Sequence, residues 1–552
     1  MKAEAWLDRF FDSYYRHRPV NATFIGVHDY DNRLPDYSED GIADVVGEMQ
    51  SLLNDLDDVD REGAPEPTAI DLRLAEGYLR VQLWEFGSGH FQNGNPSHYV
   101  GEAVFGPMSL FLREGTPIGD RMESARARFE AVPGLLDQAK STIERAPRFW
   151  IEKAIDECAG GINFAREGVG MYLAANGIEQ AGLVQAADGA ALAFEDYRRY
   201  LESEMLPSAM DDGYGCGAEE LDLCIRSGHF LDMSPAEIAA YGRQAMDEAR
   251  ERLLTGAQEL GFESWQEALA QLADRHPSAE DYLDAYGETW LAARSHAVEQ
   301  DLVSWPDFPI RFVERPAWAR SASPHLYFLF YRAPSAFDPI NVYDYLVEPL
   351  PDGDPTPVLR AHNSSVIKLN HVVHHGGIGH HVQNWHAYRA ASRIGRIAAV
   401  DCASRIAMLC GGTMAEGWSC YTTDLMDEYG FCTPLESLSQ HQSRLRMAAR
   451  AVADAELHAG DMTIGDAVAL YRDEAGMTPG AARSEAVKNS MNPGAALMYL
   501  IGTDEIHRLR RDLVTGRAGM TIRDFHDQFL SYGSIPVSII SESMRAMNQK
   551  SA

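Results

Sequence analysis

The chain has 552 residues, of which 45% are hydrophobic, and its 48 basic against 82 acidic side chains give a formal net charge of −34. This length suffices for roughly two to four ordinary domains or for one large enzyme fold. The strong negative charge argues against nucleic acid and anionic membranes as partners, because phosphate groups are bound by clustered lysine and arginine side chains. We expect a small-molecule or short-peptide ligand instead.

The N-terminal residues 1–20 lack the continuous apolar core of a signal peptide. Their apolar side chains, among them Trp6, Phe10 and Tyr14, recur three and four residues apart, which predicts an amphipathic helix. The seven cysteines are scattered and form no C-x-x-C pair, a usage typical of a reducing compartment. With no stretch long enough to span a membrane, we expect a soluble, cytoplasmic protein.

Helical periodicity dominates the first half of the chain. A proline after Ser234 and a glutamate at position 237 are typical of a capped helix start. The predicted helices span residues 40–56, 69–86, 119–146, 148–174, 190–205, 234–260 and 278–299. Residues 1–300 are therefore interpreted as an N-terminal helical region.

The pattern changes between about residues 302 and 358, where short runs of aromatic and β-branched residues are separated by prolines. Runs 309–313, 326–330 and 340–343 predict one small antiparallel sheet. Helices return downstream, at residues 401–414, 416–428, 435–459, 464–474, 494–514 and 522–532. We expect a mainly α fold in which the sheet borders a central cleft, and in which residues 301–552 form one integrated unit with the N-terminal region.

The segment 369–386, LNHVVHHGGIGHHVQNWH, is unusually rich in histidine. Its imidazoles are those of His371, His374, His375, His380, His381 and His386. Imidazole is a common ligand of zinc and similar metals. About thirty residues later, Glu416 lies among small and apolar residues, and two histidines with a distant glutamate form the ligand set of many hydrolytic zinc sites.

Two histidine pairs in this segment are alternatives for metal binding. His371 and His375 are four residues apart and share a face of a regular helix. His374 and His380 are six apart, about 240° around such a helix, and converge only if the helix breaks at the intervening glycines. Helix geometry favours the first pair, and the glycines permit the second.

An ordered series of motifs carries a family resemblance. These are residues 373–383, the Glu-Gly-Trp segment at 416–421, the arginine-rich helix at 444–450, the stretch 492–502 and the Gly-Ser-Ile-Pro at 533–536. The series resembles a bacterial family known as domain of unknown function 885, whose members carry His-Glu-x-x-Pro-Gly-His-His followed by Glu-Gly-Trp-x-x-Tyr. The resemblance covers nearly the whole chain.

This resemblance implies a large multi-helix fold related in plan to zinc carboxypeptidases. It also implies a divalent metal, zinc before manganese, iron, cobalt or nickel, held by a histidine pair and the glutamate of Glu-Gly-Trp. Aligned on the family motif, the metal ligands are His374, His380 and Glu416. His381 and His458 are candidates for orienting a ligand.

Two further roles gain support from the resemblance. Tyr499 is a candidate donor to an oxyanion. Arg444 or Arg446 is a candidate partner for a substrate carboxylate, because a guanidinium binds that group through two parallel hydrogen bonds.

One departure from the family motif bears directly on mechanism, since His375 stands where the family has a glutamate. In zinc peptidases that glutamate is the general base of hydrolysis. Imidazole also acts as a base near neutral pH, although a neighbouring dication weakens its basicity. Three outcomes stay open: His375 replaces the base, the site performs different chemistry, or catalysis is lost.

The first functional hypothesis is a divergent metal-dependent hydrolase of a small peptide-like or amide substrate, with His375, Tyr499 and Arg444 as catalytic residues. The second is a non-hydrolytic metal-dependent lyase or isomerase acting on a carboxylated small molecule. The third is a binding protein that has lost peptidase activity. The sequence does not determine the oligomeric state.

Overall fold

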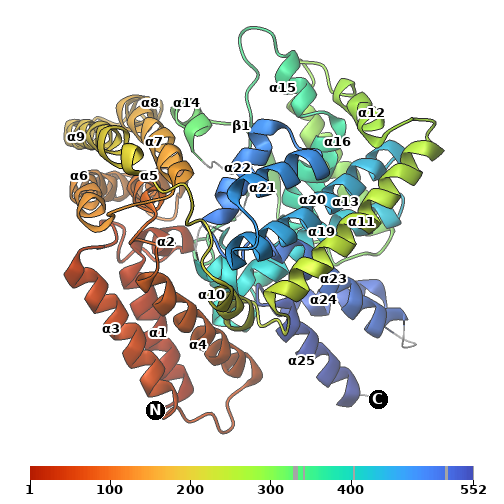
Figure 1. Cartoon of the computed structure of the whole chain (residues 1–552), viewed down its shortest axis with the longest axis horizontal. Coiled ribbons are helices and arrows are strands. Elements are labelled where there is room, and N and C mark those ends of the chain that lie inside the picture. The colour runs from red at the N-terminus through yellow and green to blue at the C-terminus, as the bar shows by residue number, and fades with distance from the viewer. Residues whose placement is uncertain (327–332, 340–341, 402–404, 516–519, 551–552) are drawn as a thin grey trace.

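The computed structural model describes residues 1–326, 333–339, 342–401, 405–515 and 520–550. Helices account for most of this part of the chain, so the expectation of a mainly α fold is confirmed (Figure 1). In the described residues, no helix is both long and apolar enough to cross a bilayer.

The N-terminal part consists of two groups of helices on one side of the molecule (Figure 1). In the first group, α1 packs against α3 and α4 through the predicted apolar face that includes Trp6 and Phe10. In the second group, α5 and α9 pack against α6 and α7. The bounds are α1 (Ala3–His17), α2 (Pro19–Ile25), α3 (Glu39–Leu56), α4 (Glu66–Gly87), α5 (Pro96–Leu112), α6 (Ile118–Thr142), α7 (Arg148–Asn163), α8 (Val169–Asn176) and α9 (Ala181–Tyr200).

The remaining helices form the larger part of the fold, where α11 packs along α20 and α19 along α23. Their bounds are α10 (Ala218–Leu223), α11 (Pro235–Glu259), α12 (Trp265–Ala270), α13 (Asp284–Glu299), α14 (Ala317–Arg320), α15 (Thr356–Ala361), α16 (Ser364–Val366), α17 (His380–Ala387), α18 (Arg393–Ile397), α19 (Gly412–Glu428), α20 (Pro434–Ala459), α21 (Ile464–Ala469), α22 (Pro479–Ser490), α23 (Met498–Arg510), α24 (Ile522–Ser531) and α25 (Val537–Lys550).

Most predicted helices are present, and the differences lie at their boundaries: the helix predicted to end at residue 146 ends at Thr142, and α19 is continuous through residue 415, where two predicted helices meet. The Ser234 side chain and Glu237 form the predicted capping box of α11. The helix predicted from residue 278 begins only at Asp284, because the Ser278 hydroxyl caps a separate turn at Asp281. The helix predicted from residue 494 begins at Met498, because Gly494 has a left-handed backbone (φ 78°).

The small sheet differs from the prediction in strand direction. Strands β1 (Ile310–Glu314) and β2 (Tyr343–Val347) pair in parallel, with Ile310 opposite Tyr343. The expectation of an antiparallel sheet is therefore wrong: Glu314 and Tyr343 are far apart in the chain, and parallel strands need such a long connection where a hairpin needs only a short turn. The strand predicted at 326–330 falls almost entirely outside the described residues, as does the start of the one predicted at 340.

The hydrophobic interior joins the two regions distinguished in the sequence. The main core extends from Trp6 of α1 to Met544 of α25, so it contains side chains from both 1–300 and 301–552. A second core fills the interface of α11 and α20, with side chains such as Leu253 and Val452. The segment rich in histidine packs against α13 and α19, and so lies within this shared framework.

Candidate metal centre

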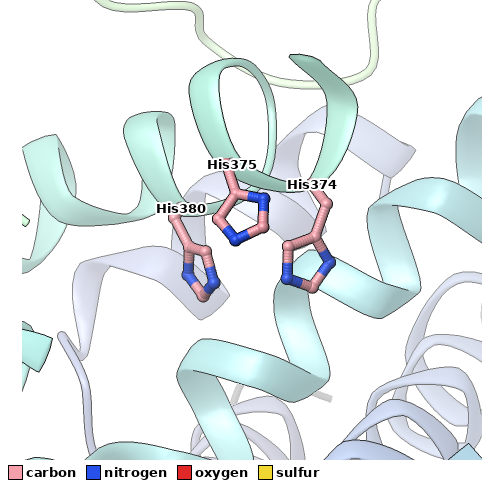
Figure 2. Close-up of side chains that lie close together, drawn as sticks. All are labelled: His374, His375 and His380. Carbon is pink, nitrogen blue, oxygen red and sulfur yellow. The ribbon is translucent and has the colours of Figure 1, made fainter. Parts of the chain in front are cut away.

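The histidine segment is divided into two helical pieces by a break at its glycines. A π-helical segment, η7 (Ile367–Gly376), ends just after His374 and His375, and α17 starts at His380. A side chain on Gly379 would overlap the carbonyl oxygen of His374, so only glycine fits where the chain doubles back. The break lets His374 and His380, six residues apart, face each other (Figure 2).

Four side chains converge at this break. Ligand nitrogens of His374, His375 and His380 all lie within 4.8 Å of one another. From α19, Glu416 Oε2 lies 3.4 Å from His374 Nε2 and 3.6 Å from His380 Nε2. These four side chains come from three elements, η7, α17 and α19, so only the tertiary structure assembles them.

The residues present fit a divalent metal. Glu416 Oε2 is buried and, among the described residues, has no partner with hydrogen-bond geometry. A buried carboxylate oxygen without such a partner is costly, and a cation supplies what it lacks. Two imidazole nitrogens and one carboxylate oxygen form a typical zinc donor set, with bonds of about 2.0–2.2 Å. Side-chain exposures of 14% for His374 and 21% for Glu416 leave the group accessible to a cation and to water.

Electrostatics place three of the four groups in the forms that such a site requires, while His380 would lose a proton on binding a metal. Burial lowers the pKa of His374 and holds that of His375 well below the usual range, and the neighbouring imidazoles act in the same direction. Burial also opposes the charged form of His380, but Glu416 outweighs it and raises that pKa. For Glu416, burial would raise the pKa, yet His374 and His380 hold it well below its usual range. The carboxylate is thus ionised, and His375 is neutral near pH 7.

His375 has a defined tautomer. Its Nδ1 lies 2.7 Å from the carbonyl oxygen of Asn370, and because a carbonyl only accepts, Nδ1 carries the proton. Nε2 is therefore the unprotonated nitrogen of the ring. The centre of the His375 ring lies 4.5 Å from that of His374 and 5.5 Å from that of His380, so His375 belongs to the cluster (Figure 2).

Two contacts that the sequence analysis missed support the cluster. Gln383 Oε1 lies 3.3 Å from His380 Nδ1, and Cys420 Sγ lies 4.0 Å from His374 Nδ1. Helix periodicity could have found both residues, because Gln383 follows His380 by three positions and Cys420 follows Glu416 by four. Residues at these spacings lie on the same face of a helix. Partners of this kind orient metal-binding imidazoles.

The other histidines point elsewhere. His371 Nδ1 lies 2.5 Å from the hydroxyl oxygen of Tyr345, so the pair of His371 and His375 does not converge. His381 donates from Nε2 to the carbonyl oxygen of Phe308 at 2.8 Å. His458 donates to the carbonyl oxygen of Asn489 at 3.1 Å. The contacts described for His381 and His458 thus bind backbone carbonyl groups, and their predicted role in orienting a ligand stays a prediction.

Tyr499 lies on the helix that packs against the Glu416 helix. A side chain on Gly417 would come within 2.6 Å of the backbone of Gly502, so this glycine pair lets α19 and α23 approach closely. Thr503 Oγ1 donates to the carbonyl oxygen of Tyr499 at 2.7 Å and lies 3.3 Å from that of Gly417. Thr503, on the same helix as Tyr499, thus joins α23 to the residue that follows Glu416.

The candidate arginines differ in their partners. Arg444 donates to Asp504 at 2.7 Å, and the same carboxylate oxygen accepts from Tyr241 at 2.6 Å. Its charge is therefore neutralised within the protein. Arg450 donates to Glu485 at 2.7 Å, and its guanidinium lies 4.5 Å from the centre of the Tyr499 ring.

A second group of possible ligands occurs at the surface, formed by His17, Asp44 and Glu48. Arg16 and Ser13 already donate to the Glu48 carboxylate, at 2.5 and 2.7 Å. Asp44 is largely exposed. This group therefore offers one neutralised and one solvated carboxylate, a poorer donor set than that of Glu416.

Comparison with known proteins gives fold and family. One solved structure, "a putative lipoprotein of unknown function from Shewanella oneidensis", superimposes with a TM-score of 0.78 at 20% identity, covering 99% of this chain and 100% of that one. A second, described as "the putative lipoprotein from Colwellia psychrerythraea", gives 0.77 at 16% identity, covering 99% and 98%. At such identities the likeness establishes the fold alone. No curated protein matches the chain in sequence.

The family model described as "Bacterial protein of unknown function (DUF885)" matches residues 19–544. The matched residues include the histidine segment, the helix α19 that carries Glu-Gly-Trp, and the helices α20 and α23 that pack against α19. The chain therefore belongs to this bacterial family, DUF885.

Proposed function

We propose that the protein is a metal-dependent hydrolase that cleaves a small peptide-like or amide substrate, with zinc as the first candidate metal. The observation that carries this proposal is the convergence of His374 and His380 on Glu416, whose buried oxygen lacks a hydrogen-bond partner in the described part of the chain. These three residues would hold the metal.

A divalent metal at this position would act as a Lewis acid on a substrate carbonyl and would lower the pKa of water. His375 would accept the proton of the attacking water, because its Nε2 carries a lone pair and its Nδ1 is tied to Asn370. Tyr499 would donate to the developing oxyanion. The central cleft that the sequence predicts would border these side chains, and the substrate amide would lie in it.

We expect gently purified wild-type protein to contain about one divalent metal ion per chain, measured by plasma mass spectrometry. His374→Ala and Glu416→Gln should each lower that content at least tenfold, because each removes one of only three ligands. His441→Ala is a control that removes an imidazole outside the cluster. Glu48→Gln is a control for the surface group at His17.

Retention of metal by both cluster variants, with loss in Glu48→Gln, would move the site to the surface group. A wild type that stays empty after incubation with zinc, manganese, cobalt and nickel would overturn the proposal and leave a binding protein on a peptidase-like fold.

We also propose a cell-envelope location, because the two structural relatives are described as lipoproteins and lipoproteins are carried at the envelope. The N-terminal sequence and the scattered cysteines predict the cytoplasm instead. Fractionation of the native bacterium, followed by immunoblotting, separates the two: we expect the protein with the envelope fraction. Co-purification with a cytoplasmic marker enzyme would support the original expectation.

A further inference from the structure

Helix α20 carries three arginines, and two of them form an ion pair with a carboxylate among the described residues. Arg444 pairs with Asp504 and Arg450 with Glu485, each at 2.7 Å. Arg446 instead donates from a terminal nitrogen to the neutral amide oxygen of Gln442 at 2.8 Å. Its Nε is buried and, in the described part of the chain, has no hydrogen-bond partner.

This arrangement is costly for the free protein. A guanidinium is charged at every physiological pH, and a buried charge without a counter-ion is strongly disfavoured. Burial and the charge of Arg450, one helical turn further along, lower the pKa of Arg446, and the charge of Glu485, which is bonded to Arg450, offsets them only in part. The chain carries 82 acidic residues, yet none is hydrogen-bonded to Arg446 in the described residues. An external anion would remove this cost.

The position of Arg446 relates it to the metal centre. Arg450 connects the two, because it lies on the Tyr499 ring and its charge acts on His374. Tyr499 in turn lies on α23, the helix that packs closely against the Glu416 helix at Gly417 and Gly502. Arg446 precedes Arg450 by one helical turn on the same face of α20, away from the Arg444 pair, so the guanidinium groups of Arg446 and Arg450 are neighbours.

We propose that Arg446 binds a carboxylate of the substrate, so that the substrate class is a small amide with a free carboxyl group, such as a short peptide or an N-acylated amino acid. This inference rests on the proposed hydrolase function and specifies its substrate. The guanidinium fork of Arg446 holds the carboxylate by two parallel hydrogen bonds. The amide one or two residues away then lies over the cluster of His374, His380 and Glu416. Of the two arginines considered from the sequence, Arg446 and not Arg444 takes this role.

Binding to metal-free protein tests the subsite independently of the metal. The probes are N-acetyl-alanyl-alanine, the same compound with its carboxyl group amidated, and inorganic phosphate, each titrated by calorimetry into chelator-treated protein. We expect the acid to bind at least tenfold more tightly than the amide. Arg446→Gln should lose that preference, Arg446→Lys should keep part of it because the charge remains without the fork, and Arg508→Gln should behave as wild type.

Stability gives a second readout that a structural arginine would not produce. Because Arg446→Gln removes an unpaired buried charge, the free variant should melt at the same temperature as wild type or higher. The acid probe should raise the melting temperature of wild type and leave that of the variant unchanged. Equal binding of acid and amide, wild-type acid binding by Arg446→Gln, or binding of phosphate alone would each overturn the inference.

These outcomes stay distinct from those of the metal measurement. An empty metal centre with intact discrimination between acid and amide would remove the hydrolase and leave the carboxylate subsite. A filled centre without discrimination would leave the hydrolase and remove the subsite.

Discussion

Replacing His375 with alanine is expected to lower turnover by at least about 100-fold, the usual contribution of a general base, while the metal content stays close to that of wild type. The reason is the geometry of this imidazole, whose proton is held on Nδ1 by Asn370 while Nε2 faces the cluster. Turnover would be measured on metal-loaded protein with a panel of short peptides and N-acylated amino acids, and metal content by plasma mass spectrometry on the same samples.

The matched variant is His375→Glu, which restores the residue type that the family motif has at this position. It should keep the metal and recover much of the activity that His375→Ala loses, because a carboxylate at the same place accepts a proton equally well. Loss of metal in His375→Ala would identify His375 as a ligand and contradict the assignment as base. Unchanged turnover in His375→Ala would remove it from the mechanism.

The largest expected effect on stability comes from Glu85. Its carboxylate binds the Arg405 guanidinium through two contacts, Nη2 to Oε1 at 2.6 Å and Nε to Oε2 at 3.0 Å. The two side chains are only 5% and 3% exposed. Breaking such a pair leaves an uncompensated buried charge, so Glu85→Ala is expected to lower the free energy of unfolding by about 3–5 kcal/mol. Chemical denaturation followed by circular dichroism measures this.

Two comparisons isolate the cause. Replacing both partners with apolar residues, Glu85→Leu together with Arg405→Met, should recover most of the loss, because neither charge is then stranded. Glu202→Ala breaks the exposed pair with Arg198 and should change stability by no more than about 0.5 kcal/mol. A loss of less than about 1 kcal/mol in Glu85→Ala would contradict the expectation that this pair is fully desolvated.

The ion pair of Glu85 and Arg405 also bears on the metal centre, so the Glu85→Ala variant should show an effect on metal binding as well as on stability. Arg405 lies just before the π-helical segment Ala407–Gly411 that leads into α19, and Glu85 lies on α4. The ion pair therefore connects the N-terminal helices to the helix that carries Glu416. A weakened pair should lower metal affinity along with stability.

The sequence by itself determined the helices, because their apolar periodicity and caps are local properties. The amphipathic face of α1 and the capping box at Ser234 are readable from a few neighbouring residues. It also predicted that the histidine segment and Glu416 belong together, because the order of its motifs resembles that of the family whose model matches residues 19–544. Helix spacing alone could not choose between the pair at 371 and 375 and the pair at 374 and 380.

Only the tertiary structure decided which imidazoles converge and which strands pair. The bend at Gly379 depends on how closely the chain returns to His374, and the parallel pairing of β1 with β2 depends on a crossover that periodicity does not encode. The same holds for charge partners: Arg444 and Arg446 are two residues apart and look equivalent in sequence. Asp504, sixty positions away, neutralises the first. The second has only Gln442 in the described part of the chain, because counter-ions are assigned by distance in space and not along the chain.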